Sequence, residues 1–324
     1  MSTVANDTRS VRVPSRTAPG LGFAVLSATS FGLSGPLARG LLDVGWSAGA
    51  AVTVRIGLAA VVLLPPALFS IWGRWGLLRR NAATILLYGA LAVTAAQFCY
   101  FQAVSSMAVA VALLIEYTAP VAVVCWLWLR HGQQPGRRTL AGTVVAAVGL
   151  VLVLDVLSGT SISVAGVLWS LGAMTGAATY FVISADEGNG LPPLVLAAGG
   201  LVTGAVLLLV LGALTLVPMR ATSTPVAYAG HSVPWWLPLL ALALVTAVLS
   251  YTTGIAAGRR LGSRLASFVA LLEVLAALAF AWLLLGQLPH VLQVVGGAVV
   301  LVGVVLVKLG EPTDRLVRRP PQPH

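Results

Sequence analysis

The octapeptide WLRHGQQP at residues 128–135 returns as WLLLGQLP at residues 282–289, after an offset of 154 residues. Both copies keep Trp-Leu, Gly-Gln and Pro at the same places. The same offset also aligns two pairs of glycines, Gly142 with Gly296 and Gly149 with Gly303. Apolar matches are frequent by chance in so apolar a chain, but Gly-Gln-x-Pro corners at a fixed offset are not. The sequence therefore predicts an internal repeat.

The composition of the chain places this repeat in a lipid bilayer. Apolar residues make up 58% of the 324 positions and charged residues 9%, whereas a soluble domain carries roughly 25% charged residues. The mean hydropathy is +0.97. The net charge is +10, but the arginines stand in short clusters between apolar runs instead of forming one basic face. This distribution argues against a nucleic-acid-binding protein and favours an integral membrane protein.

The apolar runs predict an all-α protein of ten transmembrane helices, each of about the 20 residues that a bilayer requires. The spans cover residues 20–39, 46–71, 82–103, 106–129, 139–158, 162–185, 192–217, 235–257, 263–286 and 289–308. They form a first repeat at 19–158 and a second at 162–308, with polar tails at 1–18 and 309–324. A barrel of strands is disfavoured because no long polar and apolar alternation is present.

The distribution of basic residues predicts the orientation of the chain. With the N-terminus in the cytoplasm, 16 of the 19 Lys and Arg residues fall on cytoplasmic segments and two, Arg39 and Arg220, on the outer side. The remaining one, Arg55, lies inside a span. An exception is the loop after the sixth span, which carries Asp186 and Glu187 and no basic residue. Acidic residues contribute little to orientation, so we expect both termini in the cytoplasm.

Each predicted repeat holds five spans, and this odd number has a consequence for symmetry. The second repeat must enter the membrane from the side opposite to the first. The halves are therefore predicted to be related by an axis in the membrane plane. Inverted repeats of this kind are typical of secondary transporters, in which the substrate site lies near the midplane between the halves.

Residues 20–308 resemble two copies of the repeat found in the EamA branch of the drug/metabolite transporter superfamily. The residues that carry the resemblance are Gly32, Arg55, Tyr100, Gln102, Ala103, Pro120, Gly142, Gly149, Glu273 and Gly286. The stretch LIEYTAP at residues 114–120 is similar to the threonine/homoserine exporter group. Two departures are Val274, where the family often has Pro, and Gln133 and Gln287, where it often has Glu.

The resemblance implies ten helices, no cofactor, and export of small organic solutes across a bacterial cytoplasmic membrane by a multi-pass protein. A chain without an ATP-binding domain is expected to couple transport to protons or to exchange solutes passively. Amino acids are the first expectation for the substrate, and amphipathic cations or drugs are the alternative. The sequence leaves open whether the protein is a monomer or a homodimer.

Three ionisable residues, Arg55, Glu116 and Glu273, lie near the middle of their predicted spans. A charge at that depth costs about 2.5–3.5 kcal/mol on insertion scales, so such residues usually face a cavity or a partner. Glu116 either binds a proton or a substrate amine, or forms a structural ion pair with Arg55. Arg55 either binds a substrate carboxylate or is a counter-ion. Glu273 either shares in function or makes a hydrogen bond between helices.

Polar residues of spans 3, 4 and 8 form a second group of candidates. They are Gln97, Tyr100, Gln102, Tyr117, Thr118, Tyr251 and Thr252. Each of them either lines a substrate cavity or bonds to a neighbouring helix, as polar side chains in membrane helices commonly do. Pro120, four residues after Glu116, would free a backbone carbonyl within its span.

Other classes of membrane protein explain the sequence less well. Gly32-Leu33-Ser34-Gly35 resembles the Gly-x-Ser-Gly motif of rhomboid proteases, but a nucleophilic serine needs a base within reach. All four histidines fall in loops, at a span end or in the tail. The two cysteines show no metal-ligand spacing. We therefore expect neither an enzyme nor a metalloprotein, and a channel or a scaffold remains a weaker alternative to a transporter.

Overall fold

The structure is a computed structural model that describes residues 17–106, 109–153, 163–286 and 288–310. The predicted tails, 1–18 and 309–324, lie outside the described residues except for 17–18 and 309–310, which belong to helices. Gln287 of the repeated octapeptide, residues 154–158 of the fifth span and residue 162 of the sixth also lie outside them.

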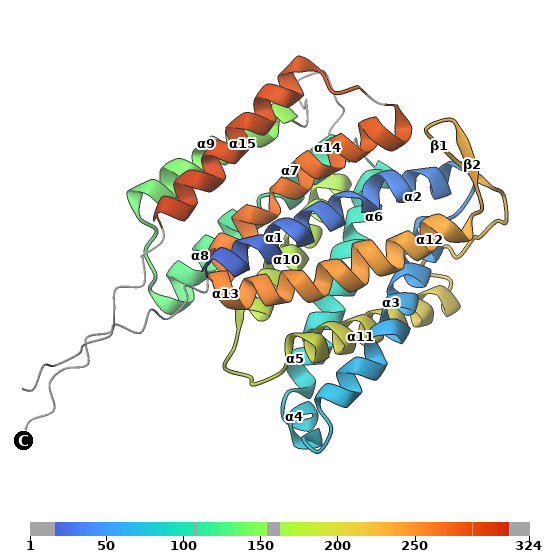
Figure 1. Cartoon of the computed structure of the whole chain (residues 1–324), viewed down its shortest axis with the longest axis horizontal. Coiled ribbons are helices and arrows are strands. Elements are labelled where there is room, and N and C mark those ends of the chain that lie inside the picture. The colour runs from blue at the N-terminus through green and yellow to red at the C-terminus, as the bar shows by residue number, and fades with distance from the viewer. Residues whose placement is uncertain (1–16, 107–108, 154–162, 287, 311–324) are drawn as a thin grey trace, which may run out of the picture.

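Helices dominate both halves of the described chain (Figure 1). The first half contains α1 (Thr17–Gly32), α2 (Ser34–Asp43), α3 (Ala48–Ser70), α4 (Trp75–Arg80), α5 (Ala82–Leu87), the π-helix η1 (Tyr88–Ala95), α6 (Ala96–Ser106), α7 (Val109–Glu116), α8 (Ala119–His131) and α9 (Arg137–Val153). The second contains α10 (Val164–Ala185), α11 (Pro193–Ala213), β1 (Val226–Tyr228), β2 (His231–Val233), α12 (Trp236–Ala243), the π-helix η2 (Leu244–Leu249), α13 (Ser250–Ala270), α14 (Leu272–Leu285) and α15 (Val291–Gly310). The antiparallel β1–β2 hairpin is a small departure from the all-α prediction.

Eight helical segments of the described chain are long and apolar enough to cross a membrane, compared with the ten spans predicted. One reason for the difference is that Trp236–Ala270 forms one segment of 35 residues. At about 1.5 Å per residue it would be about 52 Å long, well above the roughly 30 Å of a bilayer core. Gly262 interrupts it with φ 77° and ψ 161°, a conformation that glycine adopts without steric cost. The sequence places a loop there, whereas the structure has a kink.

The helices α9 and α15 lie side by side and are held together through glycines (Figure 1). A Cβ added to Gly142 would lie 2.7 Å from the Gly303 carbonyl oxygen, and one added to Gly149 would lie 2.8 Å from that of Gly296. Residue numbers rise along α9 as they fall along α15, so the helices are antiparallel. Gly142 thus meets Gly303, the repeat counterpart of Gly149, and Gly149 meets Gly296, the repeat counterpart of Gly142. A two-fold axis perpendicular to both helices requires this arrangement.

Helices α3 and α11, which are the second spans of the two repeats and so correspond to each other, also run in opposite directions. At one end, the hydroxyl of Ser47, just before α3, donates to the carbonyl of Pro218, which follows α11, at 2.7 Å. At the other end, the amide of Asn81, beyond α3, donates to the carbonyl of Asn189, which precedes α11, at 3.0 Å. Both helix pairs therefore have the relative direction that inverted repeats require.

The irregular segments of the helices also repeat at the offset of 154 residues. The turn at Tyr117 and Thr118, which separates α7 from α8, corresponds to the junction between α13 and α14 at Leu271. The π-helix η1 corresponds to residues 242–249, which contain η2. π-Helical turns within α-helices occur frequently at functional sites. Both halves thus carry a broken helix and a π-helical segment at matching places.

The outer faces of the bundle are apolar, whereas its helix contacts use small residues. Exposed side chains include Val61, Phe69, Val144, Leu209 and Val302. Lipid tails are as apolar as these side chains, so the hydrophobic effect does not bury them in a bilayer. Association of the helices therefore depends on close packing between them. The largest buried cluster gathers residues of α3, η1, α11 and α13.

We predict that Gly149→Ala destabilises the protein, whereas Gly57→Ala does not. A Cβ at Gly149 would lie 2.5 Å from the backbone nitrogen of Val300, while one at Gly57 would meet nothing within 4 Å. Overpacking typically costs about 1–3 kcal/mol, and alanine raises helix propensity by about 1 kcal/mol at either site. Thermal unfolding in detergent should show a lower transition temperature for Gly149→Ala only. Equal transition temperatures for the two variants would contradict the packing described for α9 and α15.

Candidate functional site

A cavity of about 660 Å³ lies between the two halves, with walls that come from α1, α2, α3, α6, α7, α8, α10, α13 and α14. Alanine, glycine and aromatic residues form much of its surface. All seven principal candidates from the sequence line it, namely Arg55, Gln97, Tyr100, Glu116, Tyr117, Tyr251 and Glu273. The structure therefore brings together in one cavity residues that are spread over more than 200 positions of the chain.

Three of the other polar candidates do not line this cavity. Thr118 is exposed, and its hydroxyl donates to the Ile115 carbonyl at 2.6 Å. The Thr252 hydroxyl donates to the Val248 carbonyl at 2.7 Å. Both threonines thus bond to the preceding turn of their own chain segment, so they match neither the cavity lining nor the bond to a neighbouring helix that the sequence offered as alternatives. Gln102 is also absent from the lining, whereas Pro120 is part of it.

Arg55 is buried in α3, with 6% of its surface exposed. Its Nη2 donates to the Thr246 carbonyl in η2 at 2.6 Å, and its guanidinium lies 5.8 Å from the centre of the Phe31 ring. The π-helical segment thus supplies a backbone acceptor for a charge that the apolar bundle would otherwise leave unsatisfied. Among the described residues, Arg55 Nε has no hydrogen-bond partner.

Glu273 is the carboxylate that interacts electrostatically with Arg55. It lies in the first turn of α14 and interacts electrostatically with the hydroxyl of Tyr117. Tyr117 belongs to the turn between α7 and α8. The two broken helices therefore bring polar groups toward each other in the cavity.

The predicted ion pair between Arg55 and Glu116 is not formed. In the described part of the chain, the one salt bridge within 4.0 Å joins Arg39 to Asp43. Glu116 is the last residue of α7 and interacts electrostatically with Glu273. The sequence predicts how deep a residue lies along its span, and it places both carboxylates at the level of Arg55. Depth alone therefore does not show which of the two lies beside Arg55.

An aromatic wall of four residues on α1, α10 and α13 also lines the cavity, and the sequence identified only Tyr251 among them. The ring of Tyr251 lies 5.2 Å from that of Phe31 and 5.8 Å from that of Tyr180. Tyr180 in turn lies 5.0 Å from Phe181. The Tyr180 hydroxyl is buried without a partner of acceptable geometry among the described residues. The signal that the sequence offered for Tyr180 was a tyrosine within an apolar span.

The cavity reaches the surface of the protein at α2. Arg39, whose side chain is 64% exposed, lines it together with Leu42, and Leu285 and Gln293 belong to the same lining. Near the start of α1, the helices α1 and α13 pack closely against each other. A Cβ added to Gly20 would lie 2.8 Å from the Leu261 side chain. The cavity is therefore accessible from the end of the bundle that carries the β1–β2 hairpin.

Comparison with known protein families identifies the bundle. The profile described as the EamA-like transporter family matches residues 18–155 and 164–309, which together make up most of the chain. The chain belongs to the EamA-like transporter family. The two matched stretches coincide closely with the two repeats predicted from the sequence. Members of this family are membrane transporters of small molecules, so the EamA-like chain is a multi-pass membrane protein.

Structural comparison shows that the fold of the chain occurs in a solved structure. A protein known from a crystal structure matches 91% of this EamA-like chain with 96% of its own length, at a TM-score of 0.70 and 19% sequence identity. So low an identity establishes the fold alone. A comparison with curated proteins gives no significant match. The family assignment therefore rests on the profile match, which does not extend to the threonine/homoserine exporter group.

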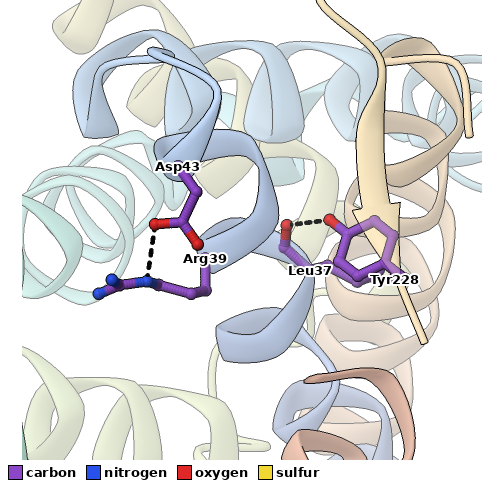
Figure 2. Close-up of polar contacts among 4 residues, drawn as sticks. All are labelled: Leu37, Arg39, Asp43 and Tyr228. Atoms are coloured by element: carbon purple, nitrogen blue, oxygen red, sulfur yellow. Dashed lines mark hydrogen bonds and ion pairs between the residues drawn. The ribbon is translucent and has the colours of Figure 1, made fainter. Parts of the chain in front are cut away.

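The β1–β2 hairpin connects two walls of the cavity mouth in this EamA-like protein. The Tyr228 hydroxyl donates to the Leu37 carbonyl of α2 at 2.6 Å, and the Ala229 amide donates to the Leu284 carbonyl of α14 at 2.7 Å. Figure 2 shows the Arg39–Asp43 pair and the Tyr228 contact on different sides of α2. Burial raises the pKa of Tyr228, and the nearby carboxylate of Asp43 raises it further.

We predict that Tyr228→Phe lowers stability by about 0.5–1.5 kcal/mol, the usual net contribution of one hydrogen bond. Because the folded-state pKa of Tyr228 is raised, the bond should persist wherever tyrosine is protonated in the unfolded chain. The difference between wild type and variant in thermal unfolding should therefore stay constant from about pH 6 to about pH 9. It should diminish only above the ordinary tyrosine pKa of about 10. Equal stability of the two proteins at neutral pH would show that this contact does not hold the mouth.

Proposed function

We propose that this protein is a secondary transporter that exports small metabolites, amino acids first among them, by alternating access in a bacterial cytoplasmic membrane. The observation that carries the proposal is a single cavity in which a guanidinium and two carboxylates face one another inside an otherwise apolar bundle. Ionisable residues at such depth mark substrate and ion pathways. A volume of about 660 Å³ is within the usual range for small-molecule sites.

The charges of the cavity suit a solute that carries both signs. Arg55 has a donor without a partner among the described residues, so it can bind a carboxylate. Glu273 lies within electrostatic range of Arg55 and can accept hydrogen bonds from an ammonium group. An α-amino acid placed between them would satisfy both residues. This arrangement assigns the substrate amine to Glu273, whereas the sequence named Glu116 as the candidate for that role.

We further propose ten spans with both termini in the cytoplasm. The antiparallel packing of α9 with α15 and of α3 with α11 supports an inverted arrangement of the halves. Dividing Trp236–Ala270 at Gly262, joining its second part to α14 as one span, and counting α9 as another span would bring the number from eight to ten. In this arrangement the cavity mouth at Arg39 faces outward, and uptake or release of protons by the carboxylates would couple transport to the proton gradient.

A second candidate function is efflux of amphipathic cations. The aromatic wall favours it, because rings beside a carboxylate attract organic cations. The two candidates differ in their need for Arg55. A zwitterion requires a positive group for its carboxylate, whereas a cation without a carboxylate does not.

We predict that Arg55→Gln abolishes transport of amino acids in proteoliposomes. Truncating one partner of a buried charge pair costs about 2–5 kcal/mol, which corresponds to a loss of about 30-fold or more. The measurement is counterflow of a panel of radiolabelled amino acids and one lipophilic cation, with Arg80→Gln on the exposed helix α4 as a matched control. Amino-acid counterflow at the wild-type rate in Arg55→Gln would exclude the assigned role of Arg55. Counterflow of the cation alone would favour the second candidate function.

The orientation predicts which loops an impermeant thiol reagent reaches in intact cells. Ser223 and Gln134 are both exposed, and they lie on opposite sides of the proposed membrane. In a variant without Cys99 and Cys125, we expect Ser223→Cys to react from outside and Gln134→Cys to react only after permeabilisation. The reverse pattern would invert the orientation of the chain.

A further inference from the structure

The first spans of the two repeats, α1 with α2 in one half and α10 in the other, correspond at an offset of 144 residues. This offset aligns Gly22 with Gly166 and Gly32 with Gly176. The later spans follow the offset of 154 residues, since the connection that contains the β1–β2 hairpin lengthens the second half. The two offsets together show which helix contact in one half corresponds to which contact in the other.

One pair of contacts between the halves obeys this correspondence. α10 packs against α6, where a Cβ added to Gly172 would lie 3.4 Å from the Cβ of Cys99. α1 packs against α13, where the Ser27 hydroxyl donates to the Ser250 carbonyl at 2.9 Å. Each contact joins the first span of one half to the third span of the other. The two contacts are therefore symmetric counterparts, and both are closed.

α10 makes a further contact with α13, which belongs to its own half. The Tyr180 hydroxyl lies directly against Gly254, and a Cβ added to Gly258 would lie 3.4 Å from the Cβ of Ser184. The two glycines stand one turn apart on α13, as Tyr180 and Ser184 do on α10. These four residues define the α10–α13 seam.

The contact that corresponds to this seam in the first half is open. The repeat counterpart of Tyr180 is Pro36 on α2, and that of Gly254 is Tyr100 on α6. Both counterparts line the cavity, and α2 and α6 touch little or not at all. The two halves therefore hold one and the same contact in two states, open in the first half and closed in the second.

The seam lies at the end of the bundle opposite to the cavity mouth. α13 runs antiparallel to α1, because Ser250 meets Ser27 whereas Leu261 meets Gly20. Gly258 is thus level with the start of α1, while the mouth lies at α2, where the same span ends. In the proposed orientation this end of the bundle faces the cytoplasm.

Two buried hydroxyl groups of the seam have no hydrogen-bond partner of acceptable geometry among the described residues. They belong to Tyr180, which is 9% exposed, and to Ser184, which is 0% exposed. A buried polar group without a partner costs about 1–3 kcal/mol. Water would satisfy both groups in a state in which the seam is open. The seam therefore carries the polar lining of a pathway although its helices are packed together.

We infer that the α10–α13 seam is the cytoplasmic gate of the transporter, and that it opens as α2 closes onto α6. This inference rests on the proposed function of alternating access and adds the route by which a solute reaches the cavity from the cytoplasm. The contacts of α10 with α6 and of α1 with α13 stay closed throughout, because they are already alike in both halves. α10 therefore moves with α6, and α1 moves with α13.

A disulfide across the seam tests this gate. Ser184→Cys and Gly258→Cys are combined in a full-length protein without Cys99 and Cys125, and their Cβ distance of 3.4 Å is close to the roughly 3.5–4.5 Å of a disulfide. Oxidation should lower amino-acid counterflow in proteoliposomes about tenfold or more, because the inward-open state is then scarcely populated. Reduction should restore it. Oxidised and reduced forms of the same protein are compared, so effects of the substitutions themselves cancel.

The matched control is a disulfide between Gly172→Cys and the native Cys99, in a protein without Cys125. It has the same Cβ distance of 3.4 Å and also starts from α10, but it crosses the contact with α6. Oxidation of this control should leave counterflow unchanged. Counterflow that survives complete cross-linking of the seam, its loss in the oxidised control, or failure of the seam cysteines to cross-link would each overturn the gate.

A second measurement needs no substrate. Ser184 and Ala173 are both 0% exposed on α10, and Ala173 lies outside the seam. In inverted membrane vesicles, a charged thiol reagent should modify Ser184→Cys and leave Ala173→Cys unmodified. Inertness of Ser184→Cys, or equal reaction at both positions, would overturn the gate. Lack of amino-acid counterflow in the wild type would instead contradict the proposed function, and the labelling would still decide on the gate.

Discussion

A charge inside a lipid bilayer must find its compensation within the protein, and this requirement governs the irregular parts of the bundle. Arg55 is buried in α3 and bonds to a carbonyl of the π-helix η2. Glu273 lies in the first turn of α14 and interacts electrostatically with Arg55 and with Tyr117, which itself lies in a helix break. The segments that depart from regular α-helix are thus the ones that supply partners, as expected where backbone at membrane depth lines a cavity.

The inverted repeat provides the frame, but the chemistry within it is asymmetric. α9 and α15 meet through paired glycines, and both halves carry a π-helical segment and a broken helix. Within that frame, the helix that corresponds to α3 contains no buried arginine, since α11 carries no charged residue and meets η1 through glycines and Thr203. One buried guanidinium, that of Arg55, and two acids at unlike positions of the repeat therefore give one cavity a direction, which two identical halves would lack.

Sequence reasoning predicted the repeat, and the structure places the three ionisable candidates around one cavity. An uncompensated charge in an apolar span is expensive, so Arg55, Glu116 and Glu273 were expected to face an interior. Sequence reasoning did not predict which carboxylate neighbours Arg55, because depth along a helix does not determine the direction of a side chain. The π-helices, the kink at Gly262 and the aromatic wall depend on packing between distant helices, and an apolar sequence carries little signal of such contacts.

The central claim is that the carboxylates and Arg55 share a water-filled cavity inside a lipid-covered bundle. The most direct measurement is the reactivity of a single cysteine at Ala277, which lines the cavity on α14, compared with one at Val302, which is exposed on α15. In proteoliposomes, a charged thiol reagent should modify Ala277→Cys rapidly and leave Val302→Cys unmodified, because only the cavity holds the water that ionises a thiol. Equal inertness at both positions, or a faster reaction at Val302→Cys, would contradict the account.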